Sequence, residues 1–259
     1  MKSSNDMQAL TRDAEDALQA GDRDLAATCY EKVLSLDADY APAYANLGLI
    51  QFELGNVERA ESLFLAGIEK DYDLREAHFN LGCLYQSIEE HESALECFRT
   101  VIEKDTDDYE AYYRMGLSCI AMKRCEDAKG FLQTAFQLKP DCLEFGLALA
   151  RYFFYHHIYD KAESVLRLLL VTHNKTPQLY YLLGLSLKEQ GKTESALAQF
   201  FRTVACDENN SMAYFFLGKC CHDLALHKQA KDFFMRARDL NAGLTDEIRF
   251  YFPDEQENG

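Results

Sequence analysis

The sequence predicts an all-α fold in which a two-helix unit is repeated seven times and the copies stack into a solenoid. The first observation is a strict period, because alanine recurs every 34 residues without insertion or deletion. A period of about 20 to 50 residues is typical of stacked arrays rather than of a domain with one central core. The alanines that define this period are Ala26, Ala60, Ala94, Ala128, Ala162, Ala196 and Ala230. The second observation is that small and bulky residues recur in phase with them.

Placing each alanine at position 20 of a unit gives seven consecutive units of 34 residues. No linker or low-complexity segment interrupts them, so the period predicts one elongated domain. Residues 1–6 are then expected to form an N-terminal cap segment, and residues 245–259 a C-terminal capping segment with an acidic tail. The seven units are 7–40, 41–74, 75–108, 109–142, 143–176, 177–210 and 211–244.

Each unit is predicted to be a pair of helices packed face to face. Positions 4, 8 and 11 share one face of a helix because their spacing follows the 3.6-residue period, and positions 20 and 24 share a face of a second helix. Position 8 is always Gly or Ala, which lets the backbones approach closely, while position 24 is bulky and is expected to fill the next layer. The residues at position 24 are Tyr30, Phe64, Phe98, Leu132, Leu166, Phe200 and Phe234.

The ends of the helices are also marked in the sequence. Asp or Asn stands at position 33 of five units, where its side-chain oxygen is expected to cap the first helix of the next unit. Position 15 suits a left-handed residue that ends a helix, and three units have Gly there. The other four have Glu89, Lys123, His157 and Ala225, so these turns are expected to be less favourable. The position-33 residues are Asp39, Asp73, Asp107, Asp141 and Asn209.

The fifth unit departs most from the pattern. Gly146 stands at position 4, where an aromatic residue is expected. A missing ring leaves either an empty space or a shift of neighbouring side chains that fills it. The fifth unit is therefore predicted to be the weakest part of the array.

The composition excludes several classes of function. A net charge of −16 repels phosphate backbones, so nucleic acid is not an expected partner. The acidity is typical of a soluble protein, and the alternative is attraction to a basic or amphipathic partner. No apolar run is long enough for a membrane span, and the first residues lack the apolar stretch of a signal peptide. These observations predict a cytoplasmic protein.

Neither metal binding nor catalysis is predicted. The nine cysteines include no C-x-x-C pair, and cysteines that share a repeat position are too far apart for a disulfide. We expect them to be reduced thiols. The sequence lacks a glycine-rich phosphate loop, an H-E-x-x-H motif and a G-x-S-x-G motif. The chain is therefore expected not to be an enzyme and to need no cofactor.

The repeat pattern resembles that of the tetratricopeptide repeat family, and the segment YANLGLIQFELGNVERAESLF from Tyr44 to Phe64 matches it closely. The resemblance covers about nine tenths of the chain and implies a right-handed superhelix of helix-turn-helix repeats. In that family, positions 2, 5, 9, 12 and 13 line a concave groove. The groove residues that this implies here are Phe52, Phe79, Cys83, Tyr113, Leu117, Ile120, Leu147, Arg151, Phe154, Tyr155, Tyr181, Leu185, Phe215 and Lys219.

This groove is apolar and aromatic, and its residues are expected to face solvent as anchors for a partner protein or peptide. One subgroup of the family grips C-terminal carboxylates through a set of Lys, Asn and Arg residues. That clamp is not supported here. It needs Lys at position 2 of the third of its three repeats, and the two repeats that could take this place have Glu110 and Glu144 instead, so the charge is reversed. The resemblance therefore implies a non-catalytic adaptor or chaperone-like scaffold. A self-assembling structural scaffold and a secretion or pilus-assembly chaperone are the alternatives, and the oligomeric state is left open.

Overall fold

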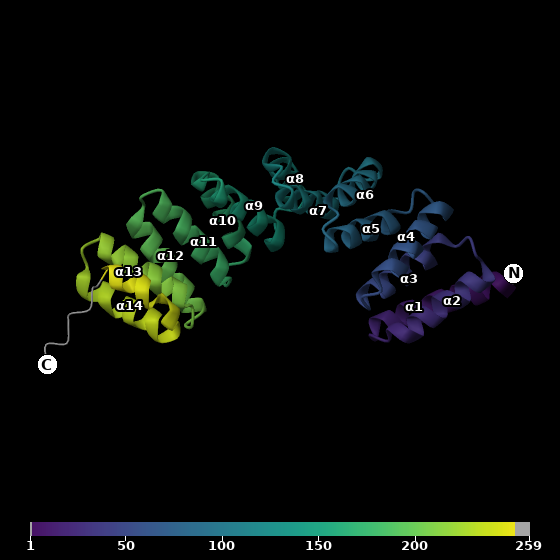
Figure 1. Cartoon of the computed structure of the whole chain (residues 1–259), viewed down its shortest axis with the longest axis horizontal. Helices are drawn as coiled ribbons and strands as arrows, with labels where there is room; N and C mark the ends of the chain where they lie inside the picture. Colours follow the sequence, from purple (N-terminus) through teal and green to yellow (C-terminus); the bar gives the residue numbers. More distant parts are fainter. Residues whose placement is uncertain (1, 252–259) are drawn as a thin grey trace. The chain divides into compact units, whose positions relative to one another are not determined.

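The computed structural model of the chain describes residues 2–251, with the side chains of residues 6–251. Every regular element in this range is helical, so the predicted all-α class is confirmed (Figure 1). Two-helix repeats make up the chain from α1 to α14, and a 3-10 turn, η1, and a short helix, α15, follow. The helices are α1 (Lys2–Gln19), α2 (Arg23–Leu36), α3 (Ala41–Glu53), α4 (Val57–Lys70), α5 (Arg75–Ser87), α6 (His91–Lys104), α7 (Tyr109–Ala121), α8 (Cys125–Leu138), α9 (Leu143–Tyr155), α10 (Tyr159–Thr172), α11 (Pro177–Glu189), α12 (Thr193–Cys206), α13 (Ser211–Asp223), α14 (His227–Leu240), η1 (Ala242–Leu244) and α15 (Thr245–Tyr251).

The chain divides into two compact units, Met1–Leu138 and Lys139–Gly259. The first contains α1 to α8 and the second contains α9 to α15. Within each unit the helices pack in chain order, each against its neighbours in sequence (Figure 1). The division falls just ahead of the fifth repeat, a break that the uninterrupted period does not predict.

The helix boundaries follow the repeat. The odd-numbered helices α3, α5, α7, α9, α11 and α13 each begin at position 1 of a predicted unit. Residues 2–6, which we expected to form a separate cap segment, belong to α1. The predicted acidic tail beyond Tyr251 lies outside the described residues.

Small and bulky residues meet inside each repeat. A Cβ atom added to Gly82 would lie 2.7 Å from the ring of Phe98, so only glycine permits this approach without a shift. The Phe98 side chain is fully buried against it. Phe64 covers Gly48 in the same way and also belongs to a core cluster that includes Leu81 of the next repeat. The bulky residue at position 24 therefore packs within its own repeat as well as against the next layer.

The fifth repeat fills the space left by its missing ring. A Cβ atom added to Gly146 would lie 2.6 Å from the side chain of Leu169, which is fully buried. Leu169 stands three residues after Leu166 on α10, so the second helix supplies the bulk that the first helix lacks. Of the two outcomes expected for this repeat, the structure shows refilling.

All seven turns between paired helices use the left-handed conformation at position 15. The φ angles are +80° at Gly21 and Gly55 and +75° at Gly191. At the Gly55 turn, the amide of Gly55 donates a hydrogen bond to the carbonyl oxygen of Phe52, and the amide of Asn56 donates one to that of Gln51. This pair of hydrogen bonds is typical of a helix C-terminus. The non-glycine residues at position 15 follow the same path, with φ of 65° at Glu89, 59° at Lys123, 59° at His157 and 58° at Ala225.

Because a side chain disfavours this conformation, we expect Ala225→Gly to raise the free energy of unfolding. The gain should be about 0.5–1 kcal/mol, since relief of the left-handed strain exceeds the extra freedom of glycine in the unfolded chain. Urea denaturation would measure it. The reciprocal change, Gly191→Ala, should lower stability by a similar amount. A destabilising effect of Ala225→Gly would contradict the assignment of strain to this turn.

The prediction that position-33 residues cap the helices is wrong. The N-cap residues stand one position later, and the side chains of Asp108 and Asn210 accept the amides of Ala111 and Ala213. The shift occurs because the helix begins at position 1, so position 34 is the last residue with non-helical geometry. Asp39 instead forms an ion pair with Lys70 at 2.8 Å. Asp73 pairs in the same way with Lys104 at 2.8 Å, which links the end of one repeat to the next.

Candidate protein-binding groove

A pocket of about 420 Å³ lies between α9 and α11, the first helices of the fifth and sixth repeats. On α9 its residues recur at intervals of four, three and one, and on α11 at intervals of three, one and three, so each set occupies one helix face. Two neighbouring helices thus turn one face each toward a shared recess, which we call the α9–α11 pocket. It is lined by Leu147, Arg151, Phe154, Tyr155, Gln178, Tyr181, Leu182 and Leu185.

The floor of the pocket is apolar and packed against neighbouring side chains. Leu182 is buried, and the Tyr181 ring contacts Phe200 of the second helix and Phe216 of the next repeat, each with ring centroids 6.0 Å apart. Burial raises the pKa of the Tyr181 hydroxyl, and the neighbouring Tyr155 adds to the rise. Tyr181 therefore stays neutral, held in place by aromatic packing beneath it.

The rim is more exposed. Tyr155 leaves 75% of its surface open to solvent, although its ring lies 5.8 Å from that of Phe154. Arg151 is also exposed, and among residues 6–251 it forms no ion pair or side-chain hydrogen bond. An apolar floor beside an aromatic ring and a free guanidinium suits recognition of another molecule's side chains.

Six of the fourteen predicted groove residues meet in this pocket, namely Leu147, Arg151, Phe154, Tyr155, Tyr181 and Leu185. The prediction missed Gln178 and Leu182. Gln178 stands at position 2, which the family pattern assigns to the groove, so the signal was present. Leu182 stands at position 6 and is recognisable only as the residue between Tyr181 and Leu185 on the same face.

The position-5 aromatics Phe79, Tyr113 and Phe215 are buried, so the expectation that they face solvent is wrong. Their exposed fractions are 9%, 7% and 6%. Position 5 borders position 8 on the helix, and the rings turn into the contact with the second helix of their own repeat. Phe79 contacts Phe98 at 5.5 Å between ring centroids, and Phe215 contacts Phe234 at 5.6 Å. Shortening them would remove core packing, not a surface anchor.

The remaining predicted residues lie outside the α9–α11 pocket. In the compact unit Met1–Leu138, Phe52, Cys83 and Leu117 are half-buried and Ile120 is 44% exposed. In the second unit, Lys219 lies on α13 with its Nζ atom over the rings of Phe215, Phe216 and Tyr251, at 5.6, 5.3 and 5.7 Å from their centroids. The aromatic rings already partner this ammonium group, and Tyr251 of α15 covers the last repeat beside it.

The cysteines provide no reactive site at the groove. Burial raises the pKa of the Cys83 thiol to about 11, although Arg114 nearby acts in the opposite direction. A thiol that stays protonated is a weak nucleophile and a poor metal ligand. Within residues 6–251 no cluster of His, Cys, Asp and Glu has the arrangement needed to hold a metal ion.

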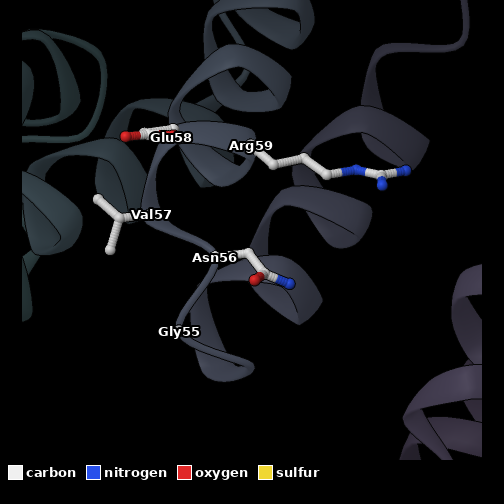
Figure 2. A pocket seen from close by; sticks show the side chains of 5 residues that line it. All are labelled: Gly55, Asn56, Val57, Glu58 and Arg59. Carbon is white, nitrogen blue, oxygen red and sulfur yellow. The ribbon is translucent and has the colours of Figure 1, made fainter.

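A second hollow, of about 490 Å³, lies at the turn between α3 and α4 (Figure 2). Its lining consists of five consecutive residues, 55–59, and the side chains of Val57 and Glu58 extend to one side of the chain while those of Asn56 and Arg59 extend to the other. Arg59 extends toward the preceding repeat, where its guanidinium lies 3.4 Å from Glu31. The hollow has neither convergent groups nor an apolar floor, so we do not regard it as a binding site. Among the described helices, none is both long and apolar enough to cross a membrane.

The repeated helix pairs and the α9–α11 pocket define a helical repeat protein with a surface recess between successive repeats. Two family models described as Tetratricopeptide repeat match residues 17–82 and residues 76–108 and 109–142. A model described as Anaphase-promoting complex, cyclosome, subunit 3 matches residues 155–237. The chain belongs to the tetratricopeptide repeat family.

Solved structures show the same fold. A tetratricopeptide repeat protein from Parabacteroides merdae is 19% identical with a TM-score of 0.62, over 95% of this chain and 98% of that one. Pseudomonas aeruginosa pilF is 18% identical with a TM-score of 0.70, over 83% and 97%. YrrB, described as a tetratricopeptide repeat protein with an unusual peptide-binding site, is 17% identical with a TM-score of 0.62, over 71% and 95%. No curated protein sequence matches this chain.

Proposed function

We propose that this protein is a non-catalytic adaptor that binds a segment of a partner protein in the α9–α11 pocket. The tetratricopeptide fold supports a scaffold for protein interactions, and the pocket supplies the particular surface. The observation that carries the proposal is the convergence of eight residues from two helices on a recess with a buried apolar floor and an exposed aromatic rim. Its volume lies in the range of about 300–1,000 Å³ typical of ligand sites.

The proposal fits the rest of the molecule. YrrB shows that a protein of this fold can carry a peptide-binding site. Nine cysteines without disulfides support a reducing compartment such as the cytoplasm, because thiols persist there. The charge excess of acidic over basic residues supports solubility and disfavours nucleic acid as the ligand.

Capture of partners from cell extract tests the proposal with one matched pair of variants. Tyr155→Ala should weaken capture about tenfold, because an exposed aromatic residue at a pocket rim contributes roughly 1–2 kcal/mol to binding. Tyr72→Ala is the control. Tyr72 is also an exposed tyrosine, with 63% of its surface open to solvent, but it belongs to the compact unit Met1–Leu138, which does not contain the pocket. Equal capture by both variants would move the site elsewhere.

The alternative of a self-assembling scaffold predicts a different result. Light scattering over a concentration series should show growing oligomers if the chain assembles with itself. A constant mass, together with partner capture that depends on Tyr155, would support the adaptor.

A further inference from the structure

The Lys and Arg side chains of the compact unit Lys139–Gly259 differ in whether another side chain already partners their charge. Lys188 forms an ion pair with Asp223 at 2.9 Å, and Lys192 forms one with Glu163 at 2.9 Å. Lys219 lies over three aromatic rings. Arg151 is the pocket-lining residue with a positive charge, and no carboxylate among residues 6–251 neutralises it.

Arg151 is the one cation among the eight residues that line this pocket, although the chain as a whole is acidic, with 43 Asp and Glu residues against 27 Lys and Arg. Arginine presents planar donors that match a carboxylate through two parallel hydrogen bonds. The local charge outweighs the net charge at contact distance, because salt screens exposed charges beyond about 8 Å at physiological ionic strength.

We infer that the α9–α11 pocket selects a partner segment in which a large apolar side chain is followed directly by Asp or Glu. The apolar side chain enters the recess above Tyr181 and Leu182, and the carboxylate pairs with Arg151. Gln178, which lines the same pocket from α11, offers an amide to the backbone of the segment. This inference rests on the proposed function and reverses the expectation of a basic partner, because the charge inside the site is positive.

The carboxylate in question is an internal side chain of the partner and not its C-terminus. A terminal carboxylate clamp in this family uses several cations together, whereas this pocket holds one. The test therefore uses peptides whose C-termini are amidated, so that only side-chain carboxylates are present.

Fluorescence anisotropy with three labelled peptides tests the inference. They are Gly-Ser-Trp-Phe-Asp-Glu-Ser-Gly-amide and the same peptide with Asn-Gln or Lys-Lys in place of Asp-Glu. The full chain should bind the acidic peptide about tenfold more tightly than the neutral one, the effect of one good charge-assisted contact. Arg151→Gln should abolish this difference between the acidic and the neutral peptide. Arg202→Gln, which makes the same charge change on α12, should preserve the difference.

Each other outcome has a defined meaning. Equal binding of all three peptides would overturn the charge preference and leave the pocket as a site for apolar side chains. Preference for the Lys-Lys peptide would overturn it in favour of a basic partner. Absence of binding by any peptide would also overturn it, while the capture experiment with Tyr155→Ala decides the proposed function separately. A variant lacking residues 252–259 repeats the measurement without the chain's own Asp254, Glu255 and Glu257, which are potential competitors.

Discussion

Replacing Phe200 with Ala is expected to lower the free energy of unfolding by about 3–5 kcal/mol. The ring of Phe200 is fully buried, and it occupies the space above Gly184, where an added Cβ atom would lie 2.7 Å away. It also stacks on Phe216 of the next repeat, with ring centroids 5.3 Å apart. Its loss leaves a cavity that the surrounding helices cannot close without losing the contacts between two repeats. Urea denaturation followed by circular dichroism measures the change.

The adjacent residue provides the control. Phe201→Ala removes the same atoms from the same helix, but Phe201 is 44% exposed. It should cost less, about 1–2 kcal/mol, because nearly half of its surface is already exposed and its main ring contact is with Phe233, at 5.5 Å between centroids. Equal costs at the two positions would contradict the assignment of position 24 to the core. Phe200→Ala should also weaken partner capture, since Phe200 supports the Tyr181 ring in the α9–α11 pocket.

Asp108→Ala is expected to have the second largest effect, a loss of about 2–3 kcal/mol. Asp108 is 6% exposed and caps α7, with its Oδ1 atom accepting the Ala111 amide at 2.9 Å. Its Oδ2 atom accepts a hydrogen bond at 2.6 Å from Arg75, the first residue of α5 and of the same 34-residue unit. Truncation therefore removes a helix cap and leaves a partly buried guanidinium without its partner. The 39% exposure of Arg75 keeps the expected loss below that of a fully buried ion pair.

Two further variants separate the contributions at this position. Asp108→Asn keeps an acceptor for the Ala111 amide and loses the charge, so about half the effect should remain. Asp107→Ala should be nearly neutral, because Asp107 is exposed and its own amide is the group that bonds Asp105. A large loss from Asp107→Ala would instead restore the capping role that the sequence suggested for position 33.

The sequence predicted which helices carry much of the candidate site, but not how deeply each of its side chains is buried. The period of the repeat placed Tyr155, Tyr181 and Leu185 on the first helices, and the structure brings them together in one pocket. The resemblance to the family implied that Phe79 and Phe215 line the groove, but both are buried. Position 5 lies on the boundary between the groove face and the face that meets the second helix. Sequence spacing gives the direction of a side chain to within one face of a helix and does not resolve such a boundary.

The sequence by itself determined the all-α class, the 34-residue period of the helix pairs and the left-handed turns, even where Ala225 replaces glycine. These features depend on local backbone geometry and on the spacing of small and bulky residues, which the chain states directly. Tertiary structure decided that Leu169 fills the space above Gly146, that Arg75 of α5 reaches Asp108, and that Arg151 has no carboxylate partner among residues 6–251. Each of these depends on which side chain of another helix reaches a given point, and that is set by packing across the repeats.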